Sequence, residues 1–104
     1  MTSDDPEPVF NEVIHAPVRL RICGLLDTYG TVRFDMLRDT IGVSDAVCSK
    51  HLKTLAEHGY VTLDKKADGG TSKAYKVTWV RLTPEGEAAF RSHVAALRQI
   101  VAGR

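Results

Sequence analysis

The alternation of apolar and polar residues predicts several helices in the first half of the chain. Five apolar residues, spaced three and four apart after Pro17, fall on one helical face: Val18, Ile22, Leu25, Leu26 and Tyr29. Leu20 and Cys23 lie off this stripe, so we expect a helix packed on more than one side that ends at Gly30. A shorter helix is predicted over residues 9–14, interrupted by Pro17, which disfavours a helical residue before it.

The next two helices are predicted from their ends as well as from their periodicity. Asp35 is expected to cap a short helix over residues 36–41, after an extended piece over residues 31–33. Gly42 is expected to close that helix in the left-handed conformation. Ser44 then caps a helix over about residues 45–58, which Gly59 ends.

The helix over residues 45–58 has two faces of opposite character. The expected inner face is apolar and contains Cys48, Leu52, Leu55 and Ala56. The opposite face is small or polar and contains Ala46, Val47, Lys50, Lys53, Thr54 and Glu57. Two helices joined by a glycine turn, with small and basic residues exposed on the second, are typical of a helix-turn-helix with its recognition helix.

The second half of the chain alternates as strands and ends as a helix. Residues 60–66 and 73–82 are rich in Val, Tyr, Thr and Trp and are separated by turn residues, which predicts a β-hairpin. Thr83 and Pro84 start a last helix that runs to about residue 102. The order predicts a single winged helix-turn-helix domain over residues 9–104, mainly α with a small β-hairpin (α+β), after a flexible tail over residues 1–8.

Composition and charge fit a small globular domain with one basic surface. The 104 residues are 43% hydrophobic and 26% charged, with a net charge of +1. Residues 44–82 hold seven basic and four acidic residues, a net charge of +3, whereas the rest of the chain carries −2. No apolar run approaches the ~18 residues of a membrane helix, and no signal peptide is seen, so we expect a cytoplasmic protein without membrane contact.

Three motifs make the chain resemble the ArsR and MarR groups of bacterial winged-helix transcription factors. They are His15-Ala16-Pro17-Val18-Arg19-Leu20-Arg21-Ile22, then Ser49-Lys50-His51-Leu52-Lys53-Thr54-Leu55 with Gly59-Tyr60-Val61, and Leu82-Thr83-Pro84-Glu85-Gly86. The resemblance implies a homodimeric, repressor-like regulator of transcription that binds a pseudo-palindromic operator in double-stranded DNA. It departs from the metal-sensing branch, because residues 36–39 contain no cysteine and His93 has no ligating partner at helical spacing.

The candidate DNA-binding residues lie on the recognition helix and at the base of the wing. On and beside the helix they are Ser44, Asp45, Val47, Ser49, Lys50, His51 and Lys53, and on the wing they are Lys65, Lys66 and Lys73. Hydroxyls and lysines suit phosphates and base edges, and a valine suits a thymine methyl. Arg33 is a further candidate for a phosphate. The alternative is that these residues form solvated faces and that Ser44 is only a cap.

The terminal segments carry more apolar residues than one small core uses. We expect a homodimer interface that contains Phe10, Val13, Leu20, Phe90, Val94, Leu97, Ile100 and Val101. A monomer core that uses the last helix is the alternative.

Other chemistry finds little support in the residues present. Cys23 and Cys48 fall within apolar helical patterns and are expected to be inert, and the four histidines are scattered, so neither a metal site nor a cofactor is predicted. No catalytic constellation is found, and an enzyme is not expected. Two alternatives remain, a protein-interaction module and a redox or metal sensor. The operator, the direction of regulation and any small-molecule effector stay open.

Overall fold

The protein folds as a mostly helical domain with one small antiparallel sheet. The computed structural model describes residues 6–67 and 76–103. In chain order the elements are α1 (Glu12–His15), α2 (Pro17–Tyr29), β1 (Val32–Arg33), α3 (Phe34–Ile41), α4 (Asp45–Glu57), β2 (Val61–Ala67), β3 (Lys76–Leu82) and α5 (Pro84–Val101). This order confirms the predicted winged helix-turn-helix architecture. The predicted turn after residue 67 and Lys73 lie outside the described residues.

The helix ends that local sequence specifies form as predicted. The Ser44 hydroxyl accepts a hydrogen bond from the main-chain N–H of Val47, and the Thr83 hydroxyl accepts one from Gly86. Gly42 ends α3 with φ 81°, in the left-handed region where glycine is unstrained. Together these residues fix the turn between α3 and α4 and the start of α5.

Two helix starts differ from the prediction. The helix expected over residues 9–14 is only the single turn of α1, because the Asn11 side chain caps it by accepting from the N–H of Ile14. The helix expected from residue 36 already starts at Phe34. Arg33 occupies the N-cap position but its side chain makes no capping hydrogen bond, and Asp35 lies in the first turn instead of capping it.

The sheet ties the wing to the helix-turn-helix. Its strand order is β1-β3-β2, and both pairs are antiparallel. The predicted hairpin pairs Val61 with Leu82 and Leu63 with Val80, and the short extended piece before α3 adds a third strand by pairing Val32 with Val80. The β3 strand is therefore held from both sides at its inner end.

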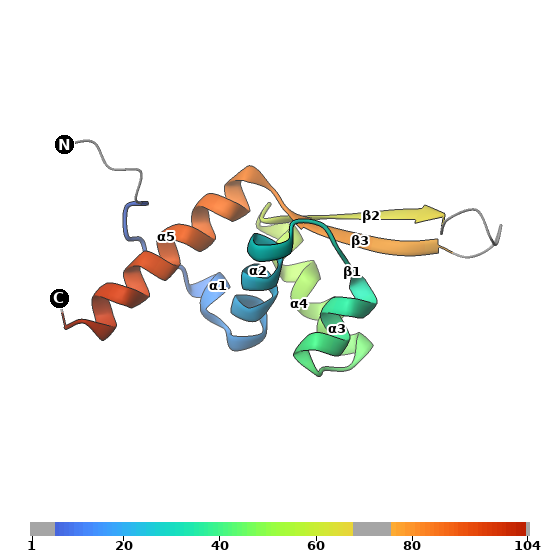
Figure 1. Ribbon diagram of the computed structural model, residues 1–104, viewed down its shortest axis with the longest axis horizontal. Coiled ribbons are helices and arrows are strands. Elements are labelled where there is room, and N and C mark those ends of the chain that lie inside the picture. Colours follow the sequence, from blue (N-terminus) through green and yellow to red (C-terminus); the bar gives the residue numbers. More distant parts are fainter. Residues whose placement is uncertain (1–5, 68–75, 104) are drawn as a thin grey trace.

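A single core joins the helices to the root of the sheet. Side chains from α1, α2, α3, α4 and the two long strands meet in it, among them Ile14, Ile22, Leu26, Leu37, Leu52, Leu55 and Val80. In Figure 1, α5 lies at one end of the molecule and the hairpin projects from the other, with the remaining helices between them. Within the described ranges, no helix has the length and apolar character needed to cross a bilayer.

Candidate DNA-binding surface

The recognition helix α4 divides into a buried and an exposed face as predicted. Cys48, Leu52 and Leu55 are buried in the core. Six of the residues expected to contact DNA from this helix are exposed: Ser44, Asp45, Val47, Ser49, Lys50 and Lys53. The seventh, His51, is half-buried. Val47 keeps 38% of its surface accessible although it is apolar. The core therefore fixes α4 by one side and leaves the other for a partner.

The N-terminus of α4 carries an acid that is already paired. An Arg38 amino group lies 2.6 Å from a carboxylate oxygen of Asp45, and the Arg38 Nε donates to Asp39 at 2.8 Å. The bond from Arg38 holds the pKa of the Asp39 carboxyl below its usual range. The charge of Asp45 is partly balanced, which reduces its repulsion of an approaching phosphate.

A surface groove connects α4 with the base of the wing. Ser49 and Lys53 line it from the helix, and Lys65 lines it from β2. Apolar and small side chains, including Leu63 and Thr78, form the rest of the lining. The two lysines form no ion pair with any residue that the structure describes, so both ammonium groups are available to a phosphate.

Two further candidate residues, Lys66 on the wing and Arg33 before α3, do not line this groove. Lys66 is exposed on β2, next to Lys65. Arg33 is half-buried and holds the Asp35 carboxylate with two bonds, at 3.0 and 3.2 Å, so its charge is largely used within the protein. Its predicted contact with a phosphate stays a prediction.

His51 is the exception on the recognition helix. It is half-buried and its Nδ1 lies 3.0 Å from an amino group of Arg19 on α2. Burial, and then the positive charges of Arg19 and Lys50, lower the pKa of His51. In the free protein Nδ1 is therefore already held by Arg19, and the predicted contact of His51 with DNA stays a prediction.

Arg19 itself was missed by the sequence analysis, although a signal for it exists. It lies four and seven residues before Cys23 and Leu26, on a face of α2 that is buried. A charged residue on a buried helical face needs a partner. His51 and the main-chain carbonyl of Val13 are the partners that the fold provides.

Comparisons with known proteins identify the family of this domain. The family of winged helix DNA-binding domains matches residues 18–101. The chain belongs to this family. An uncharacterized protein of Methanocaldococcus jannaschii is 29% identical over 92 residues, which cover 88% of the chain and 91% of that protein.

Solved structures give the same fold. A transcriptional regulator homologue from Pyrococcus horikoshii OT3 superposes with a TM-score of 0.80 at 19% identity, covering 89% of this chain and 88% of that one. A protein named as a possible transcriptional regulator for arsenical resistance has a TM-score of 0.62 at 31% identity, covering 89% and 93%. A MarR family regulator from Silicibacter pomeroyi has a TM-score of 0.68 at 20% identity, covering 88% of this chain and 58% of that one. The protein is thus a winged-helix, DNA-binding transcriptional regulator that resembles the MarR proteins.

The thiols of this winged-helix regulator are buried, as its sequence predicts. Cys23 and Cys48 are free and lie in the core. Burial raises the pKa of Cys23 to about 12, and it raises the pKa of Cys48 as well. Among the described residues no group of three or more His, Cys, Asp or Glu side chains is placed to hold a metal ion.

His93 has a partner that helical spacing could not reveal. Its ring is completely buried, and its Nε2 lies 3.1 Å from Nδ1 of His15 on α1. The main-chain N–H of Asn11 donates to the other ring nitrogen at 2.9 Å. The histidine that the sequence analysis treated as isolated therefore joins α5 to α1.

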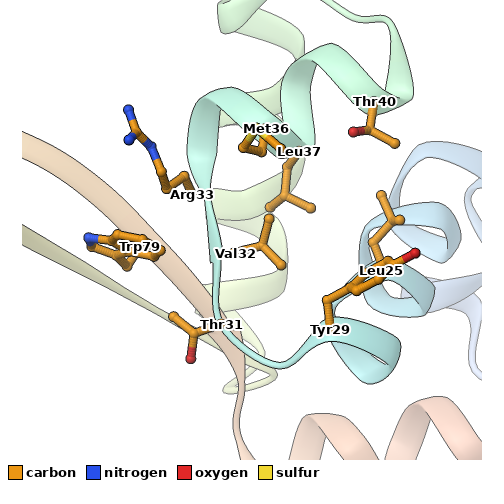
Figure 2. A pocket seen from close by; sticks show the side chains of 9 residues that line it. All are labelled: Leu25, Tyr29, Thr31, Val32, Arg33, Met36, Leu37, Thr40 and Trp79. Atoms are coloured by element: carbon orange, nitrogen blue, oxygen red, sulfur yellow. The ribbon is translucent and has the colours of Figure 1, made fainter.

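The regulator also has an apolar cavity of about 450 Å³ beside the wing root. Figure 2 shows Val32 of β1 and Leu37 of α3 between Leu25 of α2 on one side and the indole of Trp79 from β3 on the other. Tyr29, Met36 and Thr40 lie at other parts of its lining. The last helix, α5, does not contribute to this lining.

The residues predicted for a dimer interface fall into two groups. Val13, Leu20 and Phe90 are half-buried and pack against the protein's own core. Phe10, Ile100 and Val101 are exposed large apolar residues. Val94 and Leu97 are half-buried, and they line a shallow hollow on α5 together with Val101.

Proposed function

We propose that the regulator is a homodimeric repressor that recognises a specific pseudo-palindromic DNA sequence, and that it has no catalytic activity. The observation that carries this proposal is the groove between α4 and β2, where Lys53 and Lys65 approach from two elements. A DNA backbone beside a major groove would meet both lysines when α4 enters that groove. The resemblance to MarR and ArsR regulators supports the repressor role.

Sequence would be read by the exposed side chains in the first turns of α4. Val47 suits the methyl group of a thymine, and Ser49 and Lys50 suit base edges or phosphates. Asp45, held by Arg38, can accept from a cytosine amino group and disfavours bases that present acceptors. Lys65 and Lys66, with Lys73 beyond the described residues, would hold the wing on the backbone.

The proposed dimer uses the apolar face of α5. Val101 is 86% exposed and Ile100 is 60% exposed, which is unfavourable for isolated side chains of this size. A two-fold axis beside α5 would cover them and direct the two copies of α4 to half-sites about 34 Å apart.

Selection of bound fragments from a random DNA pool, followed by gel-shift assays, tests this proposal. We expect an inverted-repeat motif whose half-sites are separated by about one helical turn. Lys53→Ala and Lys65→Ala should each weaken the shift, whereas Arg91→Ala on α5 removes one charge outside both the groove and the hollow on α5. Binding of unrelated fragments with equal affinity would contradict sequence-specific recognition.

A protein-interaction module is the second candidate, and the net charge of only +1 favours it. In that case the surface around α4 would meet another protein. A pool that yields no enriched DNA, at low and at moderate salt, would leave this candidate as the better one.

A further inference from the structure

Three histidines join elements of this protein through ring hydrogen bonds, and in two of them, His93 and His51, an N–H donor faces Nδ1. The first is His93 on α5, whose Nδ1 receives the main-chain N–H of Asn11 at 2.9 Å. An N–H can only donate, so Nδ1 carries no proton and the ring proton lies on Nε2. The ring is fully buried, which leaves no water to replace these partners.

The second histidine is fixed by the first. Nε2 of His93 donates to Nδ1 of His15 at 3.1 Å, so Nδ1 of His15 is also without a proton. The Phe10 ring lies against both, with its centroid 4.7 Å from each imidazole centroid. A proton added to Nδ1 of His93 would face the Asn11 N–H and break that bond.

The third histidine lies on the recognition helix. An amino group of Arg19 lies 3.0 Å from Nδ1 of His51, and a guanidinium can only donate. His51 must therefore also be neutral at Nδ1. The Nε of the same Arg19 donates to the carbonyl of Val13 on α1, so one guanidinium joins α1 to α4.

These bonds meet at α1, a helix of a single turn. His15 and Asn11 tie it to α5, and the Val13 carbonyl ties it through Arg19 to α4. The Asn11 side-chain amide donates to the Tyr60 hydroxyl at 3.0 Å, just after α4. Figure 1 shows α1 close to α5, with α2 and α4 beyond it.

The positive groups that face His51 and His93 disfavour protonation of these two rings. His51 faces Arg19 from α2 and has Lys50 beside it on α4, while His93 faces His15 from α1 and, through Asn11, the Tyr60 hydroxyl. Among the described residues no carboxylate pairs with any of the three rings. Burial is the first cause that lowers the pKa of both His51 and His93.

We propose that Arg19 is a positioning residue for the recognition helix and that α1 is a proton-sensitive link between α5 and α4. With His51 and His93 neutral, the link holds α4 in place. Proton uptake by either of these rings breaks its hydrogen bonds and releases α1. Because the pKa of His51 and of His93 is lowered from the ordinary histidine value of ~6.5, the link is intact at neutral pH and is lost as the pH falls below that ordinary value through the lowered pKa.

The link can be tested on the whole chain without DNA. Nitrogen-15 NMR of the imidazoles should show protons on Nε2 of His51 and His93 at neutral pH. The amides of Ile14 and His15, which donate to the side-chain and main-chain oxygens of Asn11, report the release of α1. The hydrogen-exchange rate of these two amides, divided by the intrinsic rate of an unprotected amide at the same pH, should rise on acidification. The rise is at most about tenfold per pH unit for each linked proton.

A matched pair of variants isolates the end of the link on α4. In His51→Asn the side-chain oxygen can replace Nδ1 as an acceptor and cannot titrate, so the part of the acid response of α1 that passes through His51 should be lost while the part that passes through His93 remains. His58→Asn makes the same change at the exposed C-cap of α4, away from α1, and should keep the wild-type response. A proton on Nδ1 of His51 or His93 at neutral pH, or exchange in α1 that ignores their titration, would overturn the proposal.

The effect on operator binding rests on the proposed function and has its own readout. On a selected DNA fragment, wild-type affinity should fall on acidification, and His51→Asn should flatten this dependence. Affinity that instead rises with acid, with a steeper salt dependence, would mean that protonated His51 contacts phosphate, and would overturn the link. If no DNA is selected, the proposed function fails while the NMR result still decides on the link.

Discussion

Two helical glycines show how strongly a single position depends on its surroundings. A Cβ at Gly86 would lie 2.0 Å from the main-chain oxygen of Tyr60, a distance that no real contact reaches. Thr83 strengthens the same approach, since its N–H donates to the Tyr60 oxygen and its hydroxyl donates to Gly59 at 2.6 Å. Gly24 on α2 has only the tip of the Phe90 ring nearby, at 3.8 Å.

Alanine at these two positions should therefore have opposite effects. Gly86→Ala forces the start of α5 away from the chain after α4, and we expect a loss of about 3 kcal/mol in the free energy of unfolding. Gly24→Ala should add about 0.5–1 kcal/mol, because alanine restricts the unfolded chain. Urea unfolding followed by circular dichroism measures both, and equal midpoints for the two variants would contradict the close approach at Gly86.

The buried thiols give a second prediction at the scale of residues. With a pKa of about 12, only about one Cys23 side chain in ten thousand is ionised at pH 8. Labelling of the native protein with a thiol reagent should therefore be slow and should accelerate when urea unfolds it. Rapid labelling of either cysteine in the folded protein would favour the redox-sensor alternative.

At the scale of elements, local sequence determined most helix ends and one face of each long helix. Ser44, Thr83 and Gly42 act within their own turns, so their roles could be predicted from neighbours alone. Asp35 misled the prediction because Arg33 pairs with it, and β1 gained its partner from a strand almost fifty residues later. Such pairings depend on tertiary contacts that periodicity does not encode.

The same limit applies to the candidate site. The exposed face of α4 was predicted correctly, since it follows from the spacing of Cys48, Leu52 and Leu55. The bonds from Arg19 to His51 and from His93 to His15 join residues 32 and 78 positions apart. No spacing rule connects them, and only the fold brings each pair together.

The basic groove leads to a prediction for α4 and the wing. If Lys50 and Lys53 each contact one phosphate, Lys50→Ala and Lys53→Ala should each reduce the slope of log affinity against log salt by about one. The free energy of unfolding should hardly change, because both side chains are exposed. Fluorescence anisotropy at several salt concentrations gives the slopes, with Arg91→Ala as the reference, and unchanged slopes would remove these lysines from the interface.

At the scale of the whole molecule, the apolar face of α5 determines the expected assembly. Leu97 lies within the hollow between Val94 and Val101, where a partner's side chains would pack. Leu97→Asp would place a charge in that contact, so we expect monomers at concentrations where the wild type is a dimer. Sedimentation analysis measures this, with Gln99→Asp on the same helix as the control, and a variant that stays dimeric would place the interface elsewhere.

The position of Trp79 has a practical consequence. It is the only tryptophan of the chain, and β3 holds it opposite Arg33 of β1 and Asp64 of β2, in the lining of the apolar cavity. Its indole therefore sits where the helix-turn-helix, the wing and the cavity meet. The protein carries an intrinsic fluorophore at this junction, whose emission can follow wing movement or cavity filling without an attached dye.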